Sequence, residues 1–227
     1  MARVFFPSCK IKADFPAESE DVRRYLEEQH GVTTTGCCKP CRTQLTDADQ
    51  AVVICNNCAA IVEESSAAPT LTYVWELIDQ DTDFPFPDHS GMQATIQDCW
   101  AARERRSMQE AIRSLLRKMN IEIVELAENQ EHTKFCGISL YQPQPARNPK
   151  LAPKRFLEGA KGLFQEHTQE EKKRLMEEHC AQIATDKVAA YCHYCLLGLN
   201  LGGKKGFHLA RLLFEPENVC GGNYASR

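Results

Sequence analysis

The chain has 227 residues, of which 26% are charged, and a formal net charge of −4. This length suffices for a core without disulfide bonds, and the nearly balanced charge argues against a nucleic-acid-binding protein. No apolar run is long enough to cross a membrane, and the first residues lack the apolar stretch of a signal peptide. We therefore expect a cytoplasmic protein without a membrane span, whose twelve cysteines serve metal or redox chemistry.

The first third of the chain alternates short β-branched segments with helix-like ones. The predicted strands are residues 3–6, 32–35 and 51–54. One helix is predicted over residues 17–31 and another from Cys55 onward. The proline in Cys38-Lys39-Pro40-Cys41 favours a turn, and residues 70–77 fit either a strand or a helix.

A second round of the same elements follows a proline- and aspartate-containing segment, residues 81–93, which is predicted to be a linker. The linker separates a first domain, residues 1–80, from a second domain, residues 94–227. The strands predicted in the second domain are residues 94–96, 121–126 and 188–191. The helices predicted there are residues 103–119, one or two within 154–184, and 207–214. The tail from Cys220 onward is expected to be loose.

Both domains repeat the order strand, helix, strand, helix. Such alternation is typical of an α/β fold with mainly parallel sheets. We therefore predict two pseudo-symmetric strand–helix repeats. Open parallel sheets place their sites at the carboxyl ends of the strands, and cysteines follow predicted strands in both repeats.

Two Cys-x-x-Cys motifs, Cys55–Cys58 and Cys192–Cys195, each follow an apolar strand and open a predicted helix. Residues three apart lie on one helix face, so both sulfurs of a pair can reach one ion or cluster. Helix N-termini also stabilise thiolates, which are the form that metals bind. Nine of the twelve cysteines form two sets around these motifs. The first cysteine set is Cys9, Cys37, Cys38, Cys55 and Cys58, and the second cysteine set is Cys99, Cys136, Cys192 and Cys195.

The order Cys, Cys-Cys, Cys-x-x-Cys over residues 3–64 resembles the cysteine-rich CCG domain, which is named for a Cys-Cys-Gly signature. That domain occurs twice in the catalytic B subunit of heterodisulfide reductase, and residues 94–214 resemble a second, degenerate copy. The resemblance implies that the first cysteine set holds a non-cubane 4Fe-4S cluster. It further implies an oxidoreductase that reduces a disulfide or transfers electrons to or from a partner.

The two copies depart from the signature in different ways. The first has Lys39 where the signature glycine belongs, and the second keeps Gly137 but has Phe135 in place of a cysteine. Four thiolates remain in the second cysteine set, which suits a 4Fe-4S or 2Fe-2S cluster or a closed zinc site. The first cluster is therefore the expected chemical site and the second centre an electron relay. Cys38 is an essential ligand in this hypothesis, and Lys39 either pairs with an anionic thiol substrate or narrows its access.

Other interpretations remain open at this point. The first cysteine set could hold structural zinc, or Cys55 and Cys58 could act as a thioredoxin-like dithiol. The second repeat could be vestigial and keep only its fold. The alternative function is therefore a non-enzymatic metal-binding or scaffold protein with structural zinc or a cubane cluster.

The expected partners follow from two motifs that the sequence lacks. The sequence has no dinucleotide-binding glycine fingerprint and no haem-attachment motif. Reducing electrons are therefore expected from a ferredoxin-like or flavoprotein subunit, and the expected substrate is a thiol or disulfide.

Several residues near the cysteines have two interpretations each. Cys180 lies at helical spacing with apolar residues and is expected in the core, whereas Cys41 could be a spare ligand. His193 is expected to be an exposed helix-start residue, although it could act near a cluster. Three arginines could attract an anionic substrate or partner, or could simply be the solvated start of a helix; they are Arg103, Arg105 and Arg106.

Overall fold

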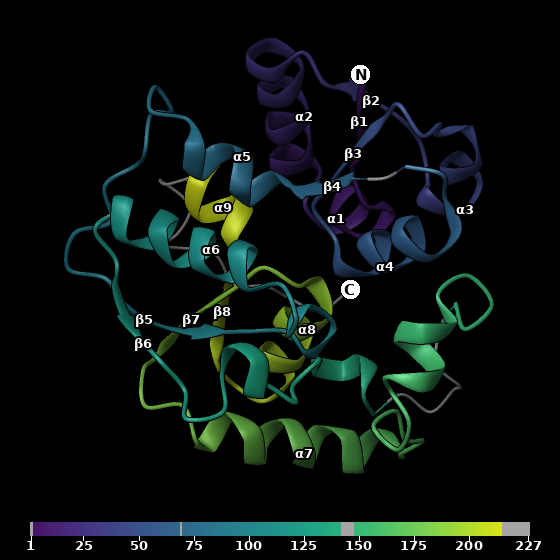
Figure 1. Ribbon diagram of the computed structural model, residues 1–227. Coiled ribbons are helices and arrows are strands. Elements are labelled where there is room, and N and C mark those ends of the chain that lie inside the picture. Colours follow the sequence, from purple (N-terminus) through teal and green to yellow (C-terminus); the bar gives the residue numbers. More distant parts are fainter. Residues whose placement is uncertain (1, 69, 142–147, 215–227) are drawn as a thin grey trace. The chain divides into compact units, whose positions relative to one another are not determined.

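The computed structural model describes residues 2–68, 70–141 and 148–214 (Figure 1). The chain divides into two compact units: unit 1 is Met1–Thr82 with Pro145–Phe164, and unit 2 is Asp83–Gln144 with Gln165–Arg227. Each unit contains one four-stranded sheet in which all neighbouring strands are parallel. The predicted α/β class with two pseudo-symmetric repeats is therefore confirmed.

The sheet of unit 1 has the strand order β2-β1-β3-β4. Its strands are β1 (Arg3–Phe6), β2 (Thr33–Thr34), β3 (Gln50–Val53) and β4 (Thr70–Tyr73). Its helices are α1 (Cys9–Asp14), α2 (Pro16–His30), α3 (Cys38–Cys41), α4 (Asn56–Ser65) and α5 (Val74–Gln80), with a 3-10 turn η1 (Arg42–Gln44) and a π-helical segment η5 (Lys154–Glu158). Strand β3 lies centrally, and its residues Ala51, Val52 and Val53 are fully buried, as expected for a strand covered on both faces.

The sheet of unit 2 repeats this arrangement in the order β6-β5-β7-β8. Its strands are β5 (Gln93–Gln97), β6 (Glu122–Val124), β7 (Lys187–Ala190) and β8 (Lys205–His208). Its helices are α6 (Arg106–Lys118), α7 (Gln169–Ala181), α8 (His193–Leu201) and α9 (Leu209–Phe214), with 3-10 turns η2 (Trp100–Ala102), η3 (Gln130–His132) and η4 (Gly137–Ser139). Helix α6 buries one apolar face, including Ile112 and Leu116, as its spacing predicts.

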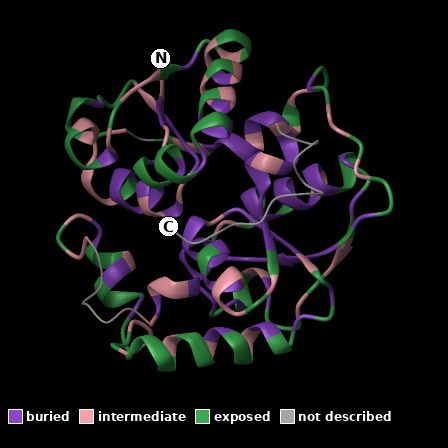
Figure 2. Ribbon diagram, turned by 180° about the vertical axis from the view of Figure 1, so that it is seen from behind, coloured by how far each residue is buried: buried purple, intermediate pink, exposed green. Residues whose placement is uncertain are grey.

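Burial follows the same plan in both units. Figure 2 shows buried residues along the strands and on the inner sides of the helices. Helix α7 is the most solvated long helix of unit 2, because only Met176 and Cys180 of its residues are buried. Within the described residues no helix combines the length and apolarity that a membrane span requires.

The segment that the sequence predicted to be a linker has little regular structure. Residues 81–92 form no helix or strand, and β5 begins at Gln93. Residues Pro145–Phe164, which the sequence placed in the second domain, cluster with unit 1. A carboxylate anchors this segment, because Glu64 at the end of α4 accepts hydrogen bonds from the amides of Lys154 at 2.7 Å and Arg155 at 2.9 Å.

Three predicted elements differ in the structure. Cys38–Cys41 is a turn of α-helix rather than a non-helical turn, because Pro40 sits in the first turn, where its missing amide is not needed. Residues 70–77 form both alternatives in succession, β4 and then α5. The predicted helix over 207–214 begins only at Leu209, since residues 205–208 pair with β7 as a strand.

The remaining differences concern helix ends and short helices. The helix predicted over 103–119 spans Arg106–Lys118, and that predicted within 154–184 is one long helix, α7, preceded by the short η5. Helix α1 was not predicted at all, because six residues are too few for a periodic pattern. The tail around Cys220 lies outside the described residues.

Candidate metal centres

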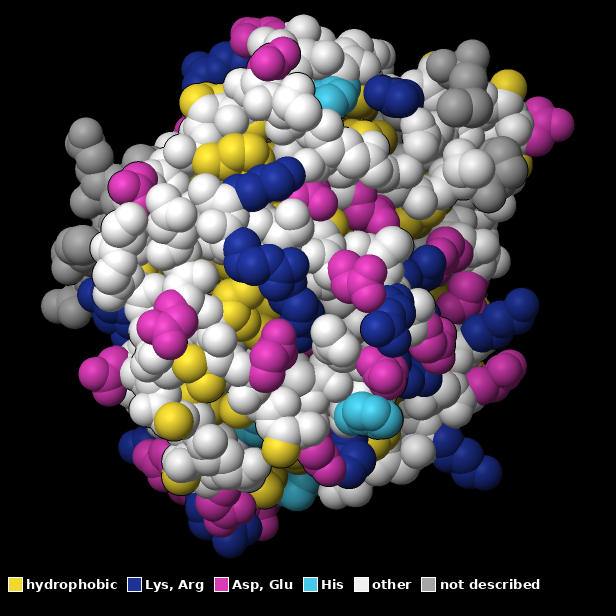
Figure 3. All heavy atoms as spheres, turned by 60° about the vertical axis from the view of Figure 1, so that its left-hand side comes forward, with side chains coloured by type: hydrophobic (Ala, Val, Ile, Leu, Met, Phe, Trp, Pro, Cys, Tyr) yellow, Lys and Arg dark blue, Asp and Glu magenta, His cyan; other side chains and the backbone are white. Residues whose placement is uncertain are grey.

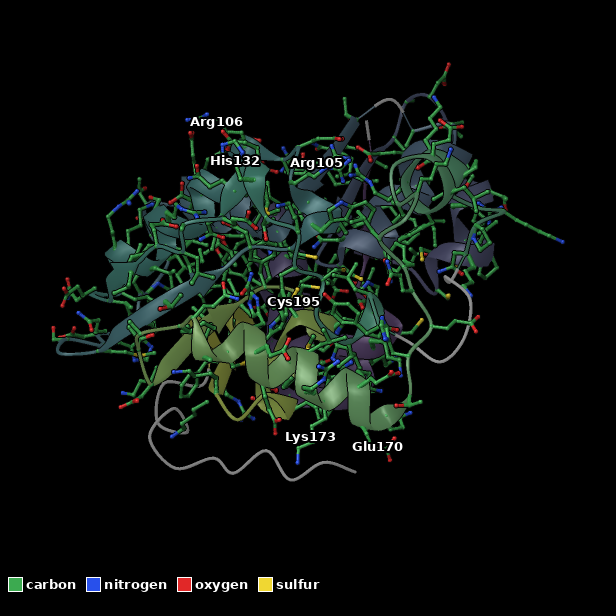
Figure 4. All side chains as sticks on the ribbon, turned by 90° about the horizontal axis from the view of Figure 1, so that it is seen from below. Arg105, Arg106, His132, Glu170, Lys173 and Cys195 are labelled. Carbon is green, nitrogen blue, oxygen red and sulfur yellow. The ribbon has the colours of Figure 1, made fainter. Side chains whose placement is uncertain are left out.

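The second cysteine set is assembled from the carboxyl ends of two neighbouring strands. Cys99 follows β5, and Cys192 follows β7 and caps α8, whose first turn carries Cys195. The Sγ atoms of these three residues all lie within 4.8 Å of one another. Cys136 lies next to this group, with its Sγ 3.6 Å from that of Cys99. Figure 4 shows Cys195 in the interior, with Glu170 and Lys173 of α7 pointing outward.

Gly137 brings Cys136 to this position. The glycine has φ +55°, and a Cβ atom added to it would lie 1.8 Å from the carbonyl oxygen of Tyr194, inside the Cys-x-x-Cys turn. Gly198 on α8 contacts the same backbone, because its own Cβ would lie 2.8 Å from Gly137 Cα. The turn after Cys136 therefore packs directly against the start of α8, which is possible only without side chains at these two positions.

The thiols of the second cysteine set shift one another's pKa values. Interactions with the Cys192 and Cys195 thiols lower the pKa of Cys136 well below its usual range. The interaction with Cys136 raises the pKa of Cys99, and burial raises that of Cys195. A cation that binds here would have to displace the protons of Cys99 and Cys195, since metals bind the thiolate form.

The first cysteine set is likewise gathered at strand ends. Cys9 follows β1, Cys37 and Cys38 follow β2, and Cys55 caps the N-terminus of α4, which carries Cys58. The interaction with Cys58 lowers the pKa of Cys38, and Cys37 acts in the same direction. Burial raises the pKa of Cys9, and a contact with Cys37 raises it further. The interactions with Cys38 and Cys55 raise the pKa of Cys58. These contacts link all five predicted ligands of the first cysteine set into one group.

The two sets differ in access to solvent. In the first cysteine set Cys9 is exposed, and Cys37 and Cys55 are half-buried. In the second, Cys99, Cys136 and Cys195 are buried and Cys192 is half-buried. The second cysteine set is therefore the more deeply buried of the two, and the first is accessible to solvent at Cys9.

The two sets also differ in the spacing of their sulfurs. A zinc ion with four sulfur ligands at 2.3 Å places the sulfurs about 3.8 Å apart, close to the 3.6 Å between Cys99 and Cys136. In the described part of the chain, no three sulfurs of the first cysteine set come as close together as those of Cys99, Cys192 and Cys195. Cys99, Cys192 and Cys195 are thus close enough together to share one ion, and Cys136 lies next to Cys99 as a candidate fourth ligand.

Phe135 occupies the place of the missing fifth cysteine and stacks on a histidine. Its ring lies 3.8 Å from the ring of His179 on α7, with 10° between the planes. His179 Nε2 is 2.7 Å from Oε1 of the fully buried Gln97. Burial lowers the pKa of His179 from 6.5 to about 4, so the stacked ring is neutral at pH 7.

This histidine predicts a pH dependence of stability. The unfolded chain binds a proton at His179 between about pH 6.5 and pH 4 that the folded chain does not, so the free energy of unfolding falls as the pH is lowered through that range. We expect His179→Gln to flatten this decline, measured by urea unfolding at pH 7 and pH 5. The exposed His132 provides the control variant, His132→Gln. Equal pH dependence in His179→Gln and the unaltered chain would contradict this account.

The structure also places three further residues that the sequence singled out, Cys180, His193 and Cys41. Cys180 is buried at 2% exposure, which confirms it as a core residue. His193 is buried rather than exposed, because the start of α8 is covered. Burial lowers the pKa of the neighbouring His208 to about 4, and His193 adds to this effect. The sequence placed His208 inside a predicted helix and did not mark it as a residue near the site. Cys41 lies beside the first cysteine set, with its Sγ against Gly36.

The arginines after Cys99 have local partners. Arg103 lies over the Trp100 ring at 4.7 Å and pairs with Glu104, and Arg106 pairs with Glu110. In Figure 4 the Arg106 side chain points outward, whereas Arg105 is half-buried. Helix α6 begins at Arg106, so these arginines do flank a solvated helix start.

Three comparisons with known proteins bear on identity. No family model, no curated protein and no solved structure matches this chain. The resemblance to the CCG domain therefore stays a prediction from the cysteine pattern, and function is inferred from the two cysteine sets.

Proposed function

We propose that this chain is an iron–sulfur redox protein of the heterodisulfide reductase B type, with substrate chemistry at the first cysteine set and a closed single-ion site at the second. The observation that carries the proposal is the contrast between the sets. The first cysteine set includes an exposed thiol, Cys9, whereas no thiol of the second is exposed and three of its sulfurs lie within 4.8 Å of one another.

A buried polar group supports a ligand at the first cysteine set. Asn56, next to Cys55, is 5% exposed, and neither atom of its carboxamide has a hydrogen-bond partner among the described residues. Buried amides are rarely left unpaired, so a bound group is the physical explanation we favour. An all-thiolate donor set fits an iron–sulfur cluster, and a non-cubane 4Fe-4S cluster would supply single electrons and an iron that binds a substrate sulfur.

The residues around the opening favour an anionic sulfur compound. Lys39 is exposed, lies next to Cys38 and helps to lower the pKa of that thiol. Its positive charge attracts a thiolate or a negatively charged disulfide. The exposed Cys9 marks the side of the set that such a substrate reaches first.

The second cysteine set is best suited to one tetrahedral ion, and we assign it zinc. Three of its sulfurs lie within 4.8 Å of one another and Cys136 Sγ is 3.6 Å from Cys99 Sγ, which supports a structural zinc site with four cysteine ligands. Because four cysteine ligands complete the coordination of a zinc ion and none of these thiols is exposed, we expect no position for a substrate at this site. The electron relay expected from the sequence is the alternative, and it requires iron in unit 2.

Reducing electrons come from another protein in this proposal, since the chain has no nucleotide- or haem-binding motif. A ferredoxin-like or flavoprotein subunit fits this need. Figure 3 shows Lys and Arg side chains interspersed with Asp and Glu over the face that it displays. Specific contacts are therefore expected to place the partner on such a surface, rather than one strongly charged patch.

Iron retention tests the first cysteine set directly. Cys38→Ser is expected to lose most of the iron bound by anaerobically purified protein, because Cys38 contacts both Cys58 and Cys37 at the centre of the set. Cys41→Ser is the matched control, since Cys41 lies on the same helical turn but outside the set. Iron content and visible absorption report the result. Full retention by Cys38→Ser, or equal loss in Cys41→Ser, would exclude the proposed ligand set.

A further inference from the structure

A buried carboxylate lies directly beside the second cysteine set. Asp98 precedes Cys99 and is fully buried. Its Oδ2 accepts hydrogen bonds from Arg113 Nη2 at 2.6 Å and from the Gln130 amide at 2.9 Å. An isolated carboxylate in such a place would be strongly unfavourable, and the Arg113 guanidinium compensates its charge.

Tyr191 joins this carboxylate to two cysteines. Its hydroxyl donates to Asp98 Oδ1 at 2.9 Å and accepts from the Cys99 amide at 3.0 Å. A phenol has a single proton to donate, so the charged acceptor fixes the orientation of the hydroxyl. Tyr191 is also the residue before Cys192. One pair of hydrogen bonds therefore ties together the strand ends that carry Cys99 and Cys192.

The same aspartate holds the segment that leads to Cys136. The Asp98 amide donates to Asn129 Oδ1 at 3.1 Å, and the Thr133 hydroxyl donates to the Asp98 carbonyl at 3.2 Å. The Gln130 amide also donates to the Asp98 side chain, so Asn129, Gln130 and Thr133 all form hydrogen bonds with Asp98. Three of the four cysteines of the second set thus sit on backbone that Asp98 fixes, directly or through Tyr191.

We infer that Asp98 and Tyr191 are positioning residues of the second cysteine set, which hold Cys99, Cys136 and Cys192 in the geometry of metal ligands before an ion arrives. The inference rests on the proposed metal site in unit 2. Residues that orient metal ligands typically change metal affinity about 10–100-fold when they are replaced. The same loss is expected on removal of the Tyr191 hydroxyl, because the Cys99 amide would then be released.

The test uses the full chain with Cys37→Ser, Cys38→Ser, Cys55→Ser and Cys58→Ser, which leaves only Cys9 of the first cysteine set. This protein is titrated with Co²⁺, whose thiolate charge-transfer absorption reports the ligands, and Zn²⁺ affinity is measured by competition. Tyr191→Phe and Asp98→Asn are the variants. Tyr25→Phe is the matched control, since Tyr25 likewise donates to an aspartate, Asp81, at 2.7 Å, and both residues belong to unit 1.

We expect Tyr191→Phe and Asp98→Asn to keep the circular dichroism of the starting protein, to lose about 10–100-fold in Zn²⁺ affinity and to shift the Co²⁺ absorption, while Tyr25→Phe changes none of these. Unchanged affinity and absorption in both variants would overturn the inference alone. A starting protein that binds no Co²⁺ would overturn the proposed unit 2 metal site as well, so the two failures are distinguishable.

Discussion

Replacing Gly137 by alanine is expected to destroy the second cysteine set. The added methyl group would lie 1.8 Å from the Tyr194 carbonyl oxygen, in a backbone turn that cannot yield without moving Cys195, and φ is +55°. Overpacking typically costs about 1–3 kcal/mol, and a left-handed conformation adds roughly 1–2 kcal/mol for a residue with a side chain. We expect a loss of several kcal/mol in the free energy of unfolding, measured with urea, and loss of Co²⁺ binding by Cys136 and its neighbours.

Gly31→Ala separates the two causes. Gly31 has φ +59°, almost the same as Gly137, but a Cβ atom there would meet no other atom within 4 Å. Its replacement should show only the backbone effect and leave the metal affinity of the second cysteine set unchanged. If Gly137→Ala were no more destabilising than Gly31→Ala and bound Co²⁺ normally, the packing of Gly137 on the α8 start would be wrong.

Replacing Arg113 by methionine is the second large change. Arg113 is buried and pairs with Asp98 at 2.6 Å and with Glu125 at 2.6 Å. Methionine keeps much of the volume but leaves the Asp98 carboxylate without a counter-charge. Removing one partner of a buried ion pair typically costs about 3–5 kcal/mol, and we expect a loss of this size in the free energy of unfolding.

Arg106→Met on the same helix is the control. Arg106 pairs with Glu110 on the surface, and exposed pairs of this kind contribute little, so its replacement should leave the urea midpoint within error. A similar small change for Arg113→Met would mean that the Asp98 network does not stabilise unit 2. An unfolded Arg113→Met protein would agree with the expected direction, and Arg113→Lys then tests whether a positive charge alone rescues the fold.

The fold could be predicted from the sequence because strands and helices here have strong local patterns. The buried strand before Cys55 is a run of β-branched residues, and α6 has a clear apolar stripe. Cys99, Cys192 and Cys195, whose sulfurs lie within 4.8 Å of one another, fall into one set by their positions relative to such strands, even though Cys99 and Cys195 lie 96 positions apart in the chain. Parallel sheets bring the ends of neighbouring strands together, so this inference needs only the strand order.

What could not be predicted depends on contacts between distant segments. Strand β8 has a glycine at its centre, Gly206, and is a strand only because it pairs with β7. Pairing of this kind leaves no local signature. The role of Asp98 was likewise hidden, although Gln97 and Asp98 are polar residues at the end of an apolar strand, a pattern that could have marked them.

The spacing between sulfurs is also absent from sequence. Equal Cys-x-x-Cys motifs start α4 and α8. The two cysteine sets built on them nevertheless differ in the exposure of their thiols and in the spacing of their sulfurs. The difference arises from the tight contact of Gly137 with Gly198 and from Phe135, which packs on His179. Only tertiary packing reveals that the second cysteine set is more deeply buried than the first.

Metal analysis of the anaerobically purified full chain tests the central claim most directly. Iron, acid-labile sulfide and zinc are counted in the same sample by elemental and colorimetric analysis. The two-centre account predicts about four irons and four sulfides at the first cysteine set together with about one zinc at the second. A colourless protein with about two zinc ions and no iron would contradict it.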